Sequence, residues 1–207
     1  HWHPSDGNSA AQSVSLANIS GKFRFAGASA HASAAPSRGR SALDGVEIMN
    51  VAVNYLREHI PDGTRIHYVV TDGGAAPNVV PDKAEVYYYV RHTDPQIVRD
   101  VFARMQKAAE GAALATETTV SFEQTGGVYN MLVNDTLGQV MDQALREVGP
   151  PAWNAQEQAF AEAMSKQLPA GRTPTPASEI RPYSIGGGGG GSTDVADVSW
   201  VTPTAGM

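Results

Sequence analysis

The sequence predicts an α+β fold whose central unit is ferredoxin-like, with an antiparallel sheet and two helices on one face. Three observations lead to this prediction. Alternating polar and apolar residues indicate strands, apolar residues at steps of three and four indicate helices, and Gly and Pro clusters separate the two patterns. Together they give the order β-α-β-β-α-β over about residues 15–125, which is typical of a split β-α-β arrangement.

The first strand and the first helix have recognisable boundaries. Charged and aromatic residues alternate from Ser20 to Gly27, which predicts a half-buried strand. Ser41 is suited to cap a helix that runs to about His59, and the turn signal Pro61-Asp62-Gly63 follows it. The apolar stripe of this helix consists of Leu43, Val46, Met49, Val53 and Leu56.

Two strands, a helix and a last strand complete the unit. The strands are expected at about Thr64 to Thr71 and Lys83 to Arg91, the second of which is dense in β-forming residues. Thr93-Asp94-Pro95 begins a helix with proline near its first turn, and Thr118 to Phe122 is the last strand. The buried side of this helix is expected to be Ile97, Val98, Val101, Phe102 and Met105.

The remainder of the chain is different in character. Residues 1–14 are expected to be a loop, and Asn134 or Asp135 begins an amphipathic helix. A second helix is expected around Trp153 to Leu168, and a short segment of alternating apolar residues ends at Trp200. These elements are too few to close a core of their own, so we expect them to pack on something outside this chain. The chain begins at His1 rather than at a methionine and stops within Val201 to Met207, so we expect it to be an internal piece of a longer protein.

The glycine run Gly186 to Gly191 is followed by Ser192-Thr193. It lacks the lysine of a phosphate-binding loop, and no helical pattern follows, so a phosphate loop is not expected. A flexible linker and a close approach of the backbone to a ligand both remain open.

Composition excludes several classes of function. The chain has 207 residues, of which 42% are hydrophobic and 17% charged, with a net charge of −6. This acidic balance argues against nucleic acid as a partner, and no stretch approaches the ~20 apolar residues of a membrane helix. Cysteine is absent, which excludes disulfides and thiolate metal sites. We expect a cytoplasmic protein, although an internal piece carries no leader and export of the parent stays open.

The residue types alone do not decide which side chains form a functional site. His1 and His3 could place two rings on one side of an extended segment, but two histidines do not complete a metal site. His31 lies in a loop of small residues, where it is either solvated or functional, and His67, on a strand, is expected to be structural. Arg91 could bind a carboxylate through its guanidinium fork or form a surface ion pair. Asn78 lies in the loop before its strand.

Several segments together resemble one known family. Phe25 to Ala32, with Gly39 to Asp44, resembles the lid domain of the co-catalytic metallo-aminoacylase and carboxypeptidase family. Three further segments resemble the amidohydrolase branch of that family that acts on p-aminobenzoyl-glutamate: Asn54 to His59, Gly73 to Pro81, and Ser192 to Trp200. The resemblance covers nearly the whole chain, and only residues 150–185 match poorly.

This resemblance implies a metal-dependent amidohydrolase that cleaves N-acyl amino acids. In the family, a ferredoxin-like lid interrupts an α/β metallopeptidase-like catalytic domain and forms the homodimer. Residues 1–14 would then be a catalytic-domain segment, 15–127 the lid and dimerisation domain, and 128–207 an incomplete catalytic-domain segment. Two divalent ions per subunit, zinc or manganese, are implied in the parent, where a metal-activated water attacks the amide carbonyl.

The resemblance also implies roles for individual residues. His3 corresponds to a metal ligand. His31 corresponds to the lid histidine that reaches the partner subunit's active site and stabilises the oxyanion of the tetrahedral intermediate. The other ligands, the bridging carboxylate and the general-base glutamate would precede position 1, and the last histidine ligand would follow Met207. We therefore expect this chain alone to be inactive.

Substrate contacts are implied as well. Asn78 and Arg91 correspond to the lid residues that hold the substrate, with the arginine on its carboxylate. A substrate-lining loop of the catalytic domain corresponds to Ser192, Thr193 and Asp194.

The predicted edge position of the strand Thr64 to Thr71 favours a homodimer, because a long unprotected edge strand tends to pair. The alternative is a non-catalytic ferredoxin-like module that dimerises or binds carboxylates and has no working metal site.

Overall fold

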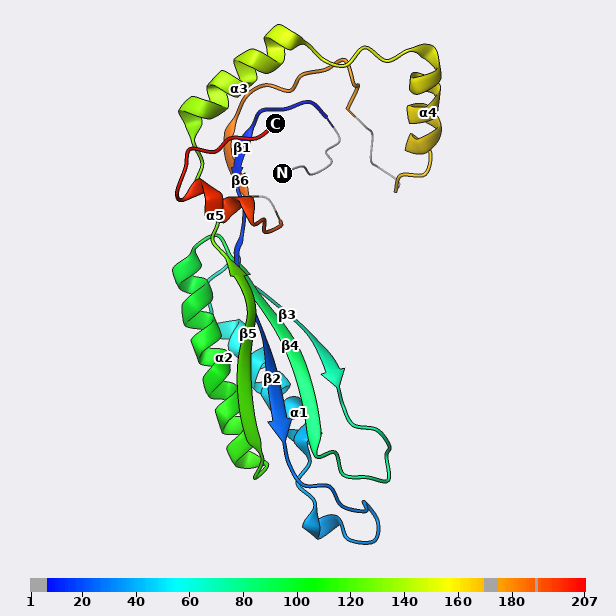
Figure 1. Cartoon of the computed structure of the whole chain (residues 1–207), viewed down its shortest axis with the longest axis vertical. Helices are drawn as coiled ribbons and strands as arrows, with labels where there is room; N and C mark the ends of the chain where they lie inside the picture. Colours follow the sequence, from blue (N-terminus) through cyan, green and yellow to red (C-terminus); the bar gives the residue numbers. More distant parts are fainter. Residues whose placement is uncertain (1–6, 170–174, 189) are drawn as a thin grey trace. The chain divides into compact units, whose positions relative to one another are not determined.

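The computed structural model describes residues 7–169, 175–188 and 190–207, and divides the chain into two compact units (Figure 1). One unit comprises Ser15–Asn130 and Gly190–Asp194, and we call it the sheet unit. The other comprises His1–Val14, Met131–Gly189 and Val195–Met207. In the described parts of both units, no helix has the length and apolar character needed to cross a membrane.

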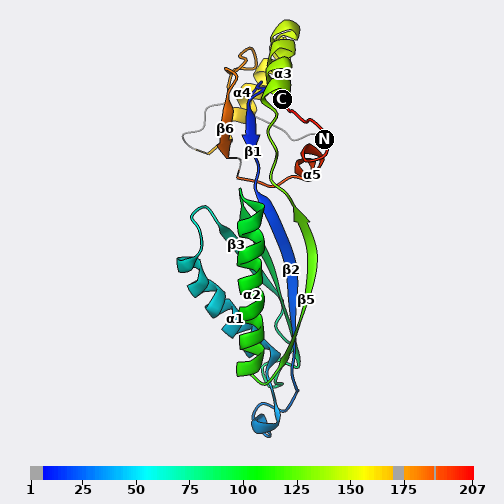
Figure 2. The ribbon, with the colours of Figure 1, turned by 90° about the vertical axis from the view of Figure 1, so that its left-hand side faces the viewer.

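The sheet unit has the predicted fold. Its antiparallel sheet has the order β3-β4-β2-β5, and both long helices lie on one side of it (Figure 2). This is the strand order of a ferredoxin-like fold, so the predicted fold class is confirmed. The elements are β2 (Ala17–Ala26), α1 (Ala42–Leu56), β3 (Arg65–Asp72), β4 (Lys83–His92), α2 (Pro95–Ala115) and β5 (Thr119–Val128).

Local side-chain bonds explain where the helices begin. The Ser41 hydroxyl accepts from the backbone N–H of Asp44 at 3.2 Å, as the sequence predicts for the start of α1. Asp94 caps α2 in the same way, and Pro95 occupies the first turn, where no N–H is needed. Gly63 adopts a φ of +82° in the predicted turn before β3.

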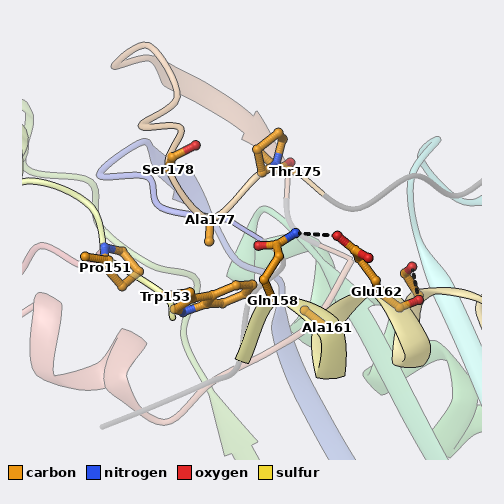
Figure 3. Close-up of a pocket in the computed structure, with 11 residues that line it drawn as sticks. Pro151, Trp153, Gln158, Ala161, Glu162, Thr175, Ala177 and Ser178 are labelled. Atoms are coloured by element: carbon orange, nitrogen blue, oxygen red, sulfur yellow. Dashed lines mark hydrogen bonds between the residues drawn. The ribbon is translucent and has the colours of Figure 1, made fainter. Parts of the chain in front are cut away.

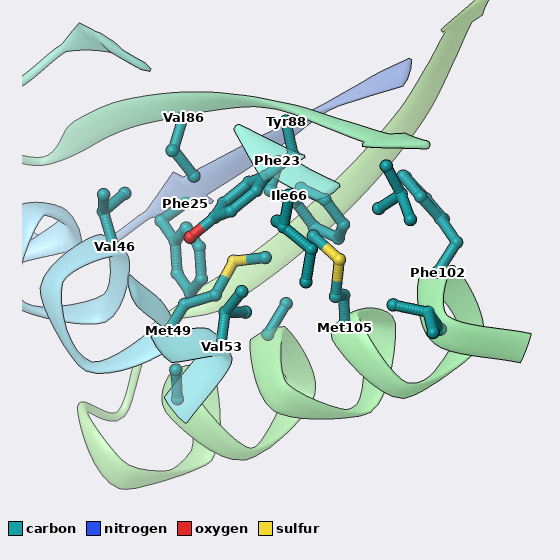
Figure 4. Close-up of a cluster of buried hydrophobic side chains, with 14 of the residues drawn as sticks. Phe23, Phe25, Val46, Met49, Val53, Ile66, Val86, Tyr88, Phe102 and Met105 are labelled. Atoms are coloured by element: carbon teal, nitrogen blue, oxygen red, sulfur yellow. The ribbon is translucent and has the colours of Figure 1, made fainter. Parts of the chain in front are cut away.

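The core of this unit lies between the helices and the inner face of the sheet (Figure 4). Phe23 is nearly fully buried, and its ring stacks on Phe102 with centroids 5.9 Å apart. Tyr88 is also buried and donates its hydroxyl to Asn50 Oδ1 at 2.5 Å. Burial raises the pKa of Tyr88, so its hydroxyl stays a donor.

The second unit has little core of its own among the residues described. It contains a two-stranded parallel sheet and three helices, and its only buried apolar residues in the described ranges are Ala10 and Ala196. The elements are β1 (Gln12–Val14), α3 (Asp135–Val148), α4 (Ala155–Ser165), β6 (Ile185–Gly188) and α5 (Val195–Ser199).

Two expectations for this part of the chain are wrong, and the glycine run begins in a strand. The expected N-terminal loop contains β1, and the start of the glycine run lies in β6, whose pairing with β1 is made by backbone groups such as Gln12 N–H to Ser184 O at 3.0 Å. The expected alternating segment before Trp200 is instead the short helix α5. There the Ser199 hydroxyl bonds back to the Ala196 carbonyl within one helical turn.

Candidate functional site

His31 and Asn78 lie together, although they are far apart in sequence. Both belong to loops that follow or precede the sheet: His31 follows β2, and Asn78 precedes β4. His31 and Val79 form an antiparallel bridge, and the Ala32 N–H donates to the Asn78 carbonyl at 2.9 Å. This short pairing holds two expected site residues at one end of the sheet unit.

The imidazole of His31 is oriented by its own loop. The backbone N–H groups of Ser33 and Ala34 donate to Nδ1 at 3.3 and 3.2 Å. Because Nδ1 accepts these bonds, the proton of the neutral ring is on Nε2. The side chain is exposed, so Nε2–H is a donor that can reach a group outside its own loop.

Arg91 lies at the opposite end of the same strand. Asn78 precedes the first residue of β4, Lys83, whereas Arg91 is next to its last residue. At 3.2–3.4 Å per residue, the eight steps from Lys83 to Arg91 span about 25 Å. The structure therefore does not bring Arg91 together with His31 and Asn78 within one subunit.

Arg91 instead lies near the segment Gly190–Asp194. Gly190 and Arg91 line the same shallow pocket of about 450 Å³. The Arg91 guanidinium lies 5.4 Å from the centre of the Tyr89 ring. Arg91 Nε and Ser192 Oγ are buried and make no hydrogen bond with the described residues. Thr193 is partly buried in this segment, and Asp194 is exposed.

Ion pairs occupy the other end of the same outer sheet face. Glu85 accepts from Lys22 at 2.9 Å and from Arg24 at 2.6 Å, and also from the Thr71 hydroxyl. The bond from Lys22, followed by that from Thr71, lowers the pKa of Glu85 to about 2. Arg24 is shared with Glu123. Both cations are therefore neutralised by carboxylates.

The lowered pKa of Glu85 predicts a pH dependence of stability. A carboxylate whose pKa is lower when folded stabilises the fold above about pH 4.5, and this stabilisation is lost as the pH falls toward 2. Because this surface cluster is screened by solvent, we expect Glu85→Gln to cost about 1 kcal/mol at pH 7 and almost nothing at pH 2. Urea unfolding at both pH values measures this. Glu47→Gln, at an exposed position of α1, should show no such difference, and an equal loss for Glu85→Gln at both pH values would contradict the assignment.

The described residues do not form a metal site. His3, the expected ligand, lies outside them. Within the described ranges, no three His, Cys, Asp or Glu residues are grouped closely enough to hold a metal ion. The donor set of these ranges therefore does not fit a dinuclear centre.

A second hollow lies beside α4 and contains none of the expected site residues (Figure 3). It measures about 570 Å³ and is lined by Trp153 and by residues from Thr175 to Ser178. Gln158 and Glu162, one helical turn apart, bond to each other at 3.1 Å across its floor. Its lining has one ionisable side chain, Glu162, and none of the expected site residues, so it is not the candidate site.

Sequence reasoning missed two residues near Arg91. Arg65 and His67 line the same pocket, because Arg65 is the cross-strand partner of Arg91 and His67 that of Tyr89. The sequence alone suggests only a structural role for His67. The signal that could have revealed both residues is the strand register, which places them on the face that carries Arg91.

One family of known proteins matches about half of the chain. The peptidase dimerisation domain family matches residues 17–117, which span β2 to the end of α2. Residues 17–117 belong to that family. The dimerisation domain therefore coincides with most of the sheet unit, and the family resemblance drawn from the sequence is confirmed.

Relatives of the dimerisation domain and its flanks are hydrolases. The chain is 38% identical to one of the subunits of p-aminobenzoyl-glutamate hydrolase of Escherichia coli (strain K12), over 99% of this chain and 48% of the relative. It is 31% identical to the Xaa-Arg dipeptidase of Mus musculus, over 65% of this chain and 31% of the relative. The chain thus spans half or less of the length of these relatives.

A solved structure shares the fold. An aminobenzoyl-glutamate utilization protein from Klebsiella pneumoniae superposes with a TM-score of 0.57 and 19% identity, over 90% of this chain and 42% of that protein.

Proposed function

We propose that the full-length protein containing this chain is a metal-dependent amidohydrolase that cleaves N-acyl amino acids such as p-aminobenzoyl-glutamate. In this proposal residues 15–127 form the dimerisation lid, and residues 1–14 and 128–207 belong to the catalytic domain. The 38% identity to a p-aminobenzoyl-glutamate hydrolase over 99% of the chain supports the class of reaction.

The observation that carries the proposal is the orientation of His31. Two backbone N–H groups hold Nδ1 as an acceptor, so an exposed Nε2–H is available without any rearrangement. A donor fixed in advance is suited to the negative charge that develops on the carbonyl oxygen when an amide is attacked. In the proposed mechanism His31 donates to that oxygen, and Asn78 lies beside it to bind the substrate.

The site is proposed to be shared between two subunits. Arg91 is proposed to bind the substrate carboxylate, yet it lies about 25 Å from the His31 loop along β4. One small substrate cannot contact both residues of a single chain over that distance. A site that uses both residues therefore takes Arg91 from one subunit and His31 from its partner.

The sheet unit has a surface suited to such a dimer. β3 is an edge strand, and its residues Tyr68 and Val69 are 41% and 55% exposed. α1 exposes Val51 and Tyr55. An exposed edge strand with apolar side chains pairs readily with a second copy, and we propose a homodimer formed there.

Metal content and amide hydrolysis of the full-length protein test the function. We expect about two divalent ions per subunit, as a dinuclear site requires, and turnover of p-aminobenzoyl-glutamate that chelation abolishes. The 207-residue chain measured beside it is expected to be inactive. A metal-free, inactive full-length protein that still binds carboxylates would contradict the proposal and favour the non-catalytic recognition module.

A further inference from the structure

The pocket around Arg91 carries more positive charge than one substrate carboxylate needs. It is lined by Leu16, Arg65, His67, Tyr89, Arg91 and Gly190, all within the sheet unit, and we call it the two-arginine pocket. Its basic residues come from the outer face of β3 and β4, opposite the helices. Neighbouring Ile66 and Val90, which point the other way, are buried in the core.

Strand register places Arg65 and Arg91 directly opposite each other on the outer face of the sheet. Arg65 and Arg91 are direct cross-strand partners, so their Cβ atoms lie about 5 Å apart. Like charges in this position destabilise a sheet unless something of opposite charge lies between them. His67, opposite Tyr89, is next to the pair on the same face.

No carboxylate of the described residues neutralises this pair. Arg65 donates only to the neighbouring Thr64 carbonyl at 3.3 Å, and Arg91 Nε is buried without a hydrogen-bond partner among the described residues. The contrast with the other end of the same face is clear, because Lys22 and Arg24 there are paired with Glu85. Among the described residues, the two-arginine pocket therefore holds two guanidinium groups without a carboxylate beside them.

We propose that the two-arginine pocket binds a dicarboxylate, namely the acidic amino acid of an N-acyl glutamate or aspartate. Arg91 holds the α-carboxylate, as in the proposed function on which this inference rests, and Arg65 with His67 binds the side-chain carboxylate. Each arginine then pairs with a carboxylate, which none of the described residues supplies. Pairing of β3 with a partner strand takes place in the plane of the sheet, so the pocket on its face stays accessible.

This assignment distinguishes between the substrates of the two relatives. One relative is named for glutamate and the other for arginine at the amino-acid position. Two unpaired guanidinium groups attract a glutamate side chain and repel an arginine side chain. The pocket thus selects acidic amino acids, which the family match to residues 17–117 does not specify.

The test measures binding to the full-length protein by isothermal titration calorimetry. The probes are p-aminobenzoyl-glutamate and p-aminobenzoyl-glutamine, which differ in one charge at nearly constant shape. We expect the glutamate compound to bind about tenfold more tightly, because a charged hydrogen bond in a solvated pocket contributes about this much. Arg65→Gln should abolish the preference while changing the affinity for the glutamine compound less than about twofold, and Arg65→Lys should retain part of it.

Two further variants separate the roles. Arg91→Gln should weaken both compounds, since both carry the α-carboxylate. Lys107→Gln removes a positive charge from the exposed side of α2 and should change neither affinity. A preference that survives Arg65→Gln, or an Arg65→Gln variant that weakens both compounds equally, would overturn the inference.

Hydrolysis of the same two compounds is measured in parallel. Charge-dependent binding that Arg65→Gln abolishes, without any turnover, would support the pocket and contradict the proposed amidohydrolase. Turnover without such a preference would support the proposed amidohydrolase and contradict the assignment of the pocket.

Discussion

His31→Ala in the full-length protein is expected to lower kcat for p-aminobenzoyl-glutamate about 100- to 1,000-fold. The physical reason is the loss of one fixed donor to the oxyanion of the tetrahedral intermediate. Substrate affinity should change far less, because the donor acts on charge that develops only during the reaction. The measurement is steady-state kinetics, and a fall in affinity at unchanged kcat would contradict the proposed role.

Mixed dimers test whether His31 acts across the subunit interface. Neither His31→Ala nor Arg91→Ala homodimers retain an intact site. In a mixed dimer, one site combines His31 from one subunit with Arg91 from the other, so that site is complete. Statistical mixing makes half of the dimers mixed with one of two sites intact, and should restore about a quarter of the wild-type turnover. Mixtures that stay inactive would show that His31 and Arg91 serve the same subunit's site.

Gly27→Ala is expected to disrupt both the sheet unit and the His31 loop. A Cβ at Gly27 would overlap the backbone oxygen of Arg40. This clash can be relieved only if the backbone itself moves. The adjacent Ala28–Arg40 bridge closes the loop that carries His31. We expect a loss of about 3 kcal/mol in the free energy of unfolding, together with a fall in kcat as His31 is displaced.

Gly111→Ala is the matched control, and it is expected to raise the free energy of unfolding. Gly111 lies inside α2, and a Cβ there would contact nothing within 4 Å. Alanine also reduces the number of conformations open to the unfolded chain, so the free energy of unfolding should rise by up to about 1 kcal/mol. Urea unfolding compares the two. Equal effects of the two substitutions would show that the clash at Arg40 does not exist.

The sheet unit was predictable because its signals are local. A side-chain cap and an apolar stripe mark α1, and the structure begins that helix at Ala42, directly after Ser41. β5 is longer than predicted, since it runs to Val128 and not to Phe122. Its last part has no apolar alternation and is held by backbone pairing with β2, as between Gly127 and Ile19.

The second unit was less predictable because its signals are not local. Gln12 pairs with Ile185 through backbone groups, and no side-chain pattern marks the partnership. α5 contains five residues, too few for a helical period to be recognised.

The candidate site likewise has a part that local signals predict and a part that depends on tertiary structure. His31, Asn78 and Arg91 were found from residue type and motif, but their distribution over two ends of β4 follows from tertiary structure. Arg65 was missed because its position opposite Arg91 depends on strand register. The loop between β3 and β4 is too long to fix that register by turn geometry alone.

The start of β2 and the end of β5 are neighbours in the sheet. Asn18, near the start of β2, and Val128, at the end of β5, are direct cross-strand partners. The segment Ser15–Asn130 therefore begins and ends at one two-stranded stem, about 5 Å wide. A host protein needs only that narrow gap between two consecutive residues to accept the whole insert. A segment with such a stem can be moved from one host domain to another without rethreading the chain.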